Sequence, residues 1–237
     1  MQKFLDLAQS HFLRMFGNIK FFPWPLFLIY DPKGYQVRGY EVREVMNQLQ
    51  PGDILLRGYD KYLSGVFIPG YFSHAGMYLG EVKPEDRQWC APELAKDKAG
   101  SYFRPGEQMV VHALAKGVFM EDIIDFCRCD RLLVVRFPQE LAQKARTDKV
   151  EADDAEFSIE EYNLFRDLRD GKTFSFDEVW PLVRRVAFSH IGKPYDFKFN
   201  FDNYNDLSCT EYVQSCIKSL APFHGCLLYT SPSPRDS

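Results

Sequence analysis

The sequence predicts a mixed fold in which a β-rich central region is followed by a helical region. Residues 51–137 contain short apolar runs bounded by Gly, Pro and polar residues, which is typical of strands. Residues 158–220 contain apolar residues at helical spacing, and three Ser-x-x-Glu capping boxes mark helix starts there. No internal repeat is evident, so a repeat architecture is not expected.

The composition is that of a globular protein with an ordinary core. The chain has 237 residues, 46% hydrophobic and 26% charged, which is long enough for one domain with insertions or for two. The net charge of -4 argues against a nucleic-acid partner, which would require a clustered basic face. No phosphate-cradling glycine motif occurs, and we expect neither a cofactor nor a metal.

Cysteine use and the start of the chain predict a cytoplasmic protein. Six Cys at irregular spacing do not resemble the disulfide framework of a small secreted domain. The first residues lack the basic segment, apolar run and cleavage site of a signal peptide. The most apolar run, residues 21–30, is interrupted by two prolines and is too short to span a bilayer.

Residues 1–20 are expected to form an amphipathic helix that ends near Gly17. This helix either docks on its own domain or makes a peripheral contact with a membrane surface. Its polar face has few Lys or Arg, which favours docking. Residues 21–30 are expected to form an extended arm, because their prolines disfavour a helix or a central strand. A short helix is predicted over residues 42–49.

The central region is predicted to contain four strands. They are expected over residues 51–57, 71–80, 109–114 and 132–137. Residues 81–108 are polar and punctuated by Pro and Gly, which predicts an insertion between the second and third strands. A short helix is expected over residues 120–126, before the fourth strand.

The helical region is predicted to begin with a second insertion, residues 139–171, which is dense in charge and contains a helix behind Ser158. Such a charge run is most often a solvated surface segment, and a lid is the alternative. The next helix is predicted over residues 175–191, although Pro181 lies inside it. Residues 226–237 are Ser/Pro-rich and aperiodic, and we expect a disordered or non-native tail.

Cys209 is the main candidate for a nucleophile. Ser208 and Glu211 form a capping box, which places Cys209 at the first position of a helix whose apolar face packs inward. Unpaired amides and the helix macrodipole at that position favour a thiolate, the form that attacks carbonyl groups. A small buried structural Cys is the alternative, and the spacing alone does not separate the two.

Two of the five His residues are candidates for the base that a nucleophilic Cys requires. His74 and His112 both lie in predicted strands, where a buried core His is the alternative interpretation of each. Zinc binding by the Cys-x-Cys pair of residues 127–129, with His112 or Cys90, is a further alternative. A single pair of this kind is a poor zinc signature.

Five groups of short motifs occur in an order that resembles a known family. They are Pro51-Gly-Asp-Ile-Leu-Leu, Phe72-Ser-His-Ala-Gly-Met-Tyr-Leu-Gly80, Val111-His-Ala with Gly117-Val-Phe, Gly192-Lys-Pro-Tyr-Asp-Phe197 and Cys209-Thr-Glu-Tyr-Val213. Together they resemble the YiiX/YaeF-like permuted papain-like amidases, a circularly permuted branch of the NlpC-type superfamily, over residues 21–220. The resemblance implies an α+β fold with an antiparallel sheet. The Cys-bearing helix would pack against that sheet and follow the His-bearing strands in the chain.

The resemblance also implies a thiol amidase or peptidase. Carried over residue by residue, Cys209 is the nucleophile, His74 the general base and His112 the third member of a Cys–His–His triad. The reaction would cleave an amide or ester bond through a thioacyl-enzyme intermediate. Asp53 and Asp196 lie inside the motifs, where a structural role at a turn is expected.

Two other functions stay open from the sequence. A lipid acyltransferase or thioesterase would use the same triad, and a non-catalytic binding domain would keep the same fold. The expected partner of the hydrolase domain, residues 21–225, is therefore a small peptide, an amide, or a lipid amide or ester.

Overall fold

A computed structural model provides the structure of the protein. The structure describes residues 19–23, 26–30, 35–60, 71–91, 94, 100, 102–142, 157–196 and 207–224. Most of the helix predicted over residues 1–20 and all of the tail predicted over residues 226–237 therefore lie outside the described residues. Residues 19 and 20 belong to a strand instead.

The proline-rich segment near the N-terminus forms a hairpin. Strands β1 (Ile19–Pro23) and β2 (Leu26–Tyr30) pair with each other in antiparallel register and form a separate two-stranded sheet. The extended conformation that was predicted from the prolines is therefore confirmed. Pro23 is the last residue of β1, which is an edge strand, and proline is tolerated in edge strands.

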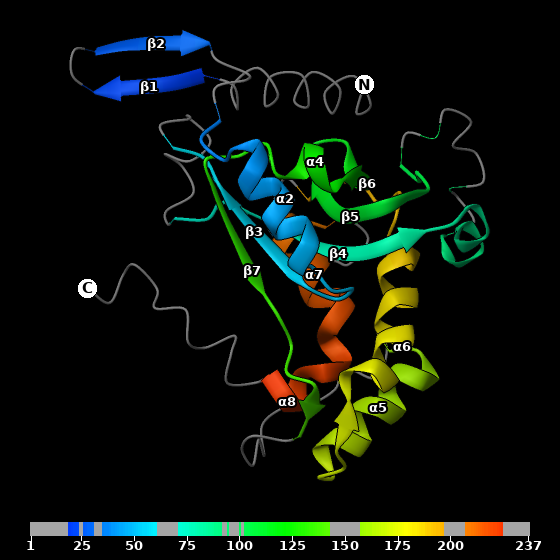
Figure 1. Ribbon diagram of the computed structural model, residues 1–237. Helices are drawn as coiled ribbons and strands as arrows, with labels where there is room; N and C mark the ends of the chain where they lie inside the picture. Colours follow the sequence, from blue (N-terminus) through cyan, green and yellow to red (C-terminus); the bar gives the residue numbers. More distant parts are fainter. Residues whose placement is uncertain are drawn as a thin grey trace.

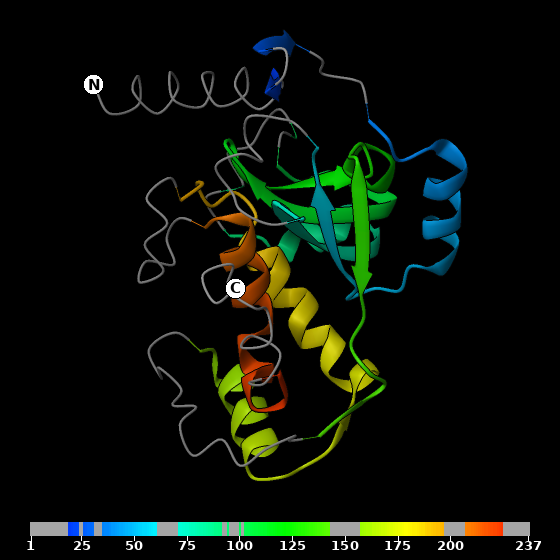
Figure 2. The ribbon, with the colours of Figure 1, turned by 90° about the vertical axis from the view of Figure 1, so that its left-hand side faces the viewer.

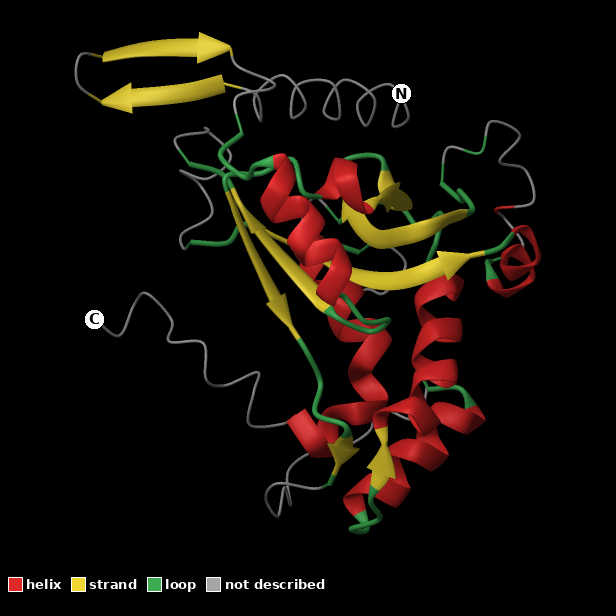
Figure 3. Ribbon diagram, viewed as in Figure 1, coloured by secondary structure: helices red, strands yellow, loops and turns green. Residues whose placement is uncertain are grey.

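The centre of the protein is a five-stranded antiparallel sheet with the order β6-β5-β4-β3-β7 (Figures 1 and 3). Its strands are β3 (Ile54–Gly58), β4 (His74–Val82), β5 (Gly106–Leu114), β6 (Gly117–Asp122) and β7 (Arg131–Val135). The four strands predicted from the apolar runs correspond to β3, β4, β5 and β7. Together with the helices, the sheet confirms the predicted α+β class with an antiparallel sheet.

Strand β6 differs from the sequence-based prediction. A helix was expected over residues 120–126, but the strand continues to Asp122 and helix α4 covers only Ile123–Phe126. The turn that joins β5 to β6 contains Gly117 at a φ of +110°, and a Cβ there would lie 2.3 Å from the carbonyl oxygen of Lys193. Only glycine fits this close approach, which fastens the hairpin to the Gly192-Lys-Pro motif.

The described parts of the two predicted insertions contain regular structure, including the helix predicted behind Ser158. Strand β4 continues to Val82 and β5 begins at Gly106, so the sheet takes up both ends of the first insertion. Between them lies the 3₁₀ helix η1 (Pro84–Trp89). The second insertion contains β8 (Glu140–Leu141), which pairs with β9 (Phe174–Ser175), and helix α5 (Ile159–Arg169).

Helix α5 packs against the C-terminal end of the Cys209 helix. Its buried apolar side chains face η4 (Lys218–Leu220) and α8 (Ala221–His224), which follow α7 (Cys209–Ile217). Cys209 lies at the opposite end of α7, about 13 Å away at 1.5 Å per residue. Helix α5 is thus part of the fold at the far end of α7 from the candidate nucleophile.

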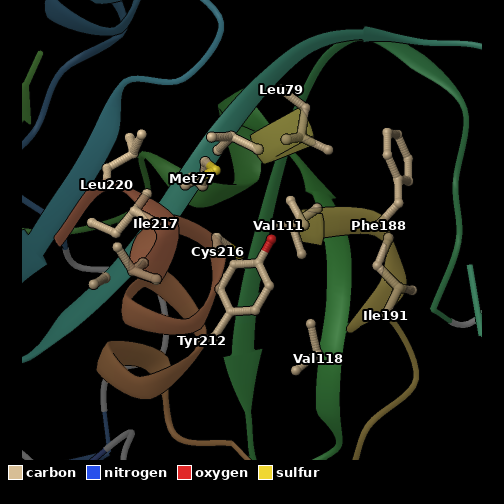
Figure 4. Packing of buried hydrophobic residues seen from close by; sticks show 14 of the residues in the cluster. Met77, Leu79, Val111, Val118, Phe188, Ile191, Tyr212, Cys216, Ile217 and Leu220 are labelled. Atoms are coloured by element: carbon tan, nitrogen blue, oxygen red, sulfur yellow. The ribbon is translucent and has the colours of Figure 1, made fainter. Parts of the chain in front are cut away.

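Helices cover the two faces of the sheet unequally. On one face, α2 (Gly39–Gln48) and α4 pack over a small cluster that includes Leu55, Tyr78 and Val110. On the other face, α6 (Phe176–Ser189) and α7 pack over the main core (Figure 2). Figure 4 shows this core from close by, with Tyr212 of α7 directed towards the strand residues Val111 and Val118.

Helix α6 confirms the helix predicted over residues 175–191 and contains Pro181. The proline removes one backbone bond, to the carbonyl of Asp177, in the first turns of the helix. Asp177 is exposed, so water can satisfy that carbonyl. None of the described helices is both long and apolar enough to cross a membrane.

Candidate active site

Helix α7 begins at a reciprocal capping box that holds Cys209 at the first helical position. The Ser208 hydroxyl accepts from the Glu211 amide at 3.4 Å, and the Glu211 carboxylate accepts from the Ser208 amide at 2.7 Å. All three side chains are buried. The cap predicted from the sequence is therefore confirmed, and it fixes the entry of the chain into α7.

The Cys209 sulfur lies among backbone amides from two elements. Burial raises the pKa of the Cys209 thiol, whereas hydrogen bonds from the amides of Ala75, Thr210 and Cys209 itself lower it. The burial effect is the larger, so the thiol pKa lies above its ordinary value. The thiolate expected from the helix terminus is therefore not favoured in the unliganded protein, because a charged sulfur would lose its solvation.

The Ala75 amide connects the sulfur to strand β4. Ala75 directly follows His74, the first residue of β4. Strand β5 pairs with β4 from Gly76 onwards, so the Ala75 amide lies outside that part of the ladder and is able to donate to Cys209. Helix α7 packs against β4 and β5, and the Ala75 amide places the start of the helix at this end of β4.

His74 and His112 form a hydrogen-bonded pair. The His74 Nε2 and His112 Nδ1 atoms are 2.8 Å apart, and the ring planes cross at 81°. The sheet register produces this contact, because His112 pairs with Gly76 and His74 lies two residues before Gly76 on the same face. No hydrogen bond joins the Cys209 thiol to the His74 ring among the described residues; the two are connected through Ala75.

Both rings are held in the neutral form. Burial, followed by the positive charge of Arg57, lowers the pKa of each His well below its usual value of 6.5. His112 is fully buried and His74 is 8% exposed. The site therefore contains a neutral thiol and two neutral imidazoles, and none of these three groups is a buried charge that needs a partner.

Gly76 and Phe126 hold the two imidazole rings together. A Cβ on Gly76 would lie 2.8 Å from the Phe126 ring, so only glycine allows this aromatic side chain to lie against the strand. Phe126 and Phe119 then contact the His112 ring, with centroids 5.3 and 4.4 Å away. This packing leaves His112 little freedom to rotate.

Two charged residues that sequence reasoning missed complete the surroundings of the pair. Arg57 lies opposite His74 on β3, donates to the Phe126 carbonyl at 3.0 Å and stacks over the Phe126 ring at 4.4 Å. Glu121 lies on β6, with its Oε2 atom 3.1 Å from His112 Nε2 and 3.6 Å from an Arg57 nitrogen. Only the recognition of β6 as a strand would have placed Glu121 beside His112.

The other residues discussed from the sequence lie elsewhere. Asp53 is buried in the turn before β3, where its carboxylate pairs with Arg136, and Asp196 is buried after the Gly192-Lys-Pro motif. Cys127 and Cys129 are buried thiols that follow the end of α4. Among the described residues no group of three or more His, Cys, Asp or Glu side chains is arranged to hold a metal.

A comparison with protein families identifies the chain. The sequence profile of the permuted papain-like amidase enzyme family YaeF/YiiX, designated C92, matches residues 48–185, which is more than half of the chain. The chain belongs to this family. It is therefore a hydrolase of the papain-like amidase and peptidase class.

The region matched to the C92 family contains both strand histidines, whereas Cys209 lies beyond its end. Searches of curated proteins and of solved structures found no match. The assignment of individual catalytic residues in this C92 amidase therefore depends on the geometry of its own side chains.

Proposed function

We propose that the protein hydrolyses an amide bond by nucleophilic catalysis, with Cys209 as the nucleophile, His74 as the general base and His112 as the third residue. The His74–His112 hydrogen bond of 2.8 Å carries this proposal. It occupies Nε2 of His74 and leaves Nδ1 as the nitrogen able to accept a proton from the thiol. A base held by a third group beside a nucleophile is the arrangement that triad chemistry requires.

A contact of Cys209 with the residue after His74 supports the same assignment. The Ala75 amide donates to the Cys209 sulfur, which places the sulfur at the end of β4 where His74 lies. A direct hydrogen bond between them would form when a substrate binds, because catalytic hydrogen bonds are often long in unliganded enzymes. The His-bearing strands precede the Cys-bearing helix, which is the order expected of a permuted papain-like fold.

The proposed reaction starts from neutral groups. The Cys209 thiol transfers its proton to His74 Nδ1 as the sulfur attacks the amide carbonyl carbon, which gives a tetrahedral oxyanion and an imidazolium. The Cys209 amide, at the N-terminus of α7, is suitably placed to donate to that oxyanion. His74 then gives the proton to the leaving amine, and a thioester remains on Cys209.

Water completes the cycle in the second half of the reaction. His74 accepts a proton from water, the hydroxide attacks the thioester, and the carboxylic acid leaves as the thiol is restored. We assign this chemistry to a single papain-like domain formed by residues 21–225. The amide class of substrate follows from the C92 family, and no described contact favours a lipid substrate over a peptide.

Substitution of the nucleophile tests the proposal. We expect Cys209→Ala to lose hydrolysis of every substrate found in a panel of peptides, cell-wall peptides and amides, and to lose labelling by iodoacetamide at residue 209. Cys90→Ala is the matched control, because Cys90 is a partly exposed thiol whose pKa is raised to about 11 by burial. If Cys209→Ala retains hydrolysis, Cys209 is not the nucleophile and the assignment is refuted.

A further inference from the structure

The chain of polar contacts that begins at His74 continues beyond His112. Register places the four side chains Arg57, His74, His112 and Glu121 on one face of the sheet, from the adjacent strands β3, β4, β5 and β6. His112 Nδ1 faces His74, and His112 Nε2 faces Glu121 Oε2 at 3.1 Å. Both nitrogens of the buried His112 ring are therefore directed at a polar neighbour.

The atoms His112 Nε2 and Glu121 Oε2 have no hydrogen-bond partner among the described residues. Their separation is that of an ion pair, but the ring N–H is not aligned with the oxygen as in a hydrogen bond. Two buried polar atoms at this separation gain from alignment, since an unmade hydrogen bond is costly. The Glu121 side chain is 25% exposed, which leaves it room to rotate into line.

We propose that Glu121 is a positioning residue that selects the tautomer in which His74 acts as a base. An ionised carboxylate offers acceptors only, so His112 Nε2 must carry a hydrogen to bond to it. His112 Nδ1 is then an acceptor and receives the hydrogen of His74 Nε2. His74 Nδ1 is consequently left with a lone pair, which is the form that can take the Cys209 proton.

Arg57 makes the opposite tautomer the default when Glu121 is removed. Its guanidinium offers only donors and lies near both Glu121 and His112. With no carboxylate between them, His112 Nε2 would act as an acceptor and Nδ1 would carry the hydrogen. The hydrogen on His112 Nδ1 would be donated to His74 Nε2, and His74 Nδ1 would become protonated and unable to act as a base.

The remaining charged group near His112 does not replace Glu121. Lys116, in the turn between β5 and β6, lowers the pKa of His112 together with Arg57, and its ammonium lies 3.3 Å from the centroid of the Phe119 ring. Both cations oppose a positive charge on the imidazoles, so Glu121 is the one carboxylate among the described residues in contact with the pair. It also lowers the energy of the imidazolium that forms during the reaction.

The test compares two substitutions that separate the hydrogen bond from the charge. Glu121→Leu removes the acceptor, whereas Glu121→Gln keeps an oxygen that can accept from both Arg57 and His112. Glu81→Leu on β4 is the matched control, because the Glu81 side chain is 64% exposed and forms a surface ion pair with Lys83. Nitrogen-15 NMR of the imidazole rings reports the tautomers, and the rate of alkylation of Cys209 by iodoacetamide reports the base.

We expect Nε2–H tautomers on both rings in the wild-type protein, in Glu121→Gln and in Glu81→Leu. In Glu121→Leu both rings should change to Nδ1–H, and alkylation of Cys209 should slow by at least about tenfold. An Nδ1–H tautomer in the wild-type protein overturns the proposal. Unchanged tautomers in Glu121→Leu overturn it as well, and the wild-type spectrum decides alone if that variant does not fold.

This inference rests on the proposed function, but the two fail differently. The tautomers are measured without a substrate, so they test Glu121 whatever the protein hydrolyses. If the tautomers are as expected while Cys209→Ala retains hydrolysis, the nucleophile is wrong and the role of Glu121 in positioning the two rings stands. If Cys209→Ala is inactive while the wild-type rings carry Nδ1–H tautomers, the assignment of the nucleophile stands and the role of Glu121 is wrong.

Discussion

Cys209 and His74, which we propose as nucleophile and base, are both neutral in the unliganded protein. Burial dominates at both residues: it raises the pKa of the thiol and lowers the pKa of the imidazole, and each effect disfavours the charged form. A thiolate–imidazolium pair would therefore have to be formed during the reaction. The amides around the sulfur and the carboxylate of Glu121 lie where they would stabilise the two charges as they develop.

The pH dependence of alkylation checks this description of the thiol. Because burial raises the pKa of Cys209, we expect the rate of its reaction with iodoacetamide to rise with pH and to have its midpoint above about 8.5, the value of a free thiol. Mass spectrometry would assign the labelled residue at each pH, with Cys209→Ala as the blank. A midpoint well below that of a free thiol would instead show that the unliganded protein holds a thiolate.

At the scale of elements, features marked by local sequence signals were predicted, whereas an element defined by long-range pairing was missed. The capping boxes at Ser158, Ser175 and Ser208 are local features, and all three open a helix in the structure. Strand β6 was missed because its apolar run is short and leads directly into α4, and Asp122, whose side chain caps that helix, was not recognised as the boundary. The pairing of β6 with β5 is a tertiary contact that the sequence does not reveal. Because β6 was missed, its residue Glu121 was not recognised as a neighbour of His112.

Asp53 joins two elements and provides a prediction about stability. Its carboxylate accepts from the Gln50 amide at 2.8 Å and from two Arg136 nitrogens at 2.7 and 2.8 Å, which ties the start of β3 to the end of β7. We expect Asp53→Asn to lower the free energy of unfolding by about 1–3 kcal/mol, because it breaks a charge-assisted pair whose acid is buried. Urea denaturation would measure the loss.

Asp167→Asn is the control for Asp53→Asn, since it removes a partly exposed carboxylate that pairs with Lys172 at the surface. We expect little change in the unfolding midpoint of that variant, because surface ion pairs are worth little. Alkylation of Cys209 should be unaffected in both variants. Equal unfolding midpoints for the two would contradict the structural role of Asp53.

At the scale of the whole molecule, three histidines of the described part of the chain are buried in neutral form. They are His74, His112 and His190, and the pKa of His190 is lowered to about 3 by burial and by nearby lysines. Each takes up a proton at a higher pH in the unfolded chain than in the folded protein. Below pH 6.5 the unfolded state therefore binds more protons, and the folded state loses stability as the pH falls.

Replacement of His190 tests this dependence away from the active site. A group with this shift costs about 1.4 kcal/mol for each pH unit below its unfolded value, down to the folded-state pKa. We expect His190→Leu to weaken the fall in stability between pH 6.5 and pH 4, as measured by urea denaturation at several pH values. Its ring nitrogens have no hydrogen-bond partner among the described residues, so His190→Leu leaves no described donor or acceptor without its partner. An unchanged pH dependence would mean that His190 is solvated or protonated in the folded protein.

The sequence by itself determined the α+β class, the four strands built on apolar runs, the capped start of α7 and the identity of Cys209, His74 and His112 as candidates. The strands and the cap depend on residue type and short-range spacing, and the fold class on the order of motifs that resembles the family, all of which are visible along the chain. Only the tertiary structure decided which atoms meet. Strand register brought the two imidazoles to 2.8 Å and placed Arg57 and Glu121 around them. Burial then reversed the expected charge of the thiol, because solvation depends on everything packed around a residue rather than on its neighbours in sequence.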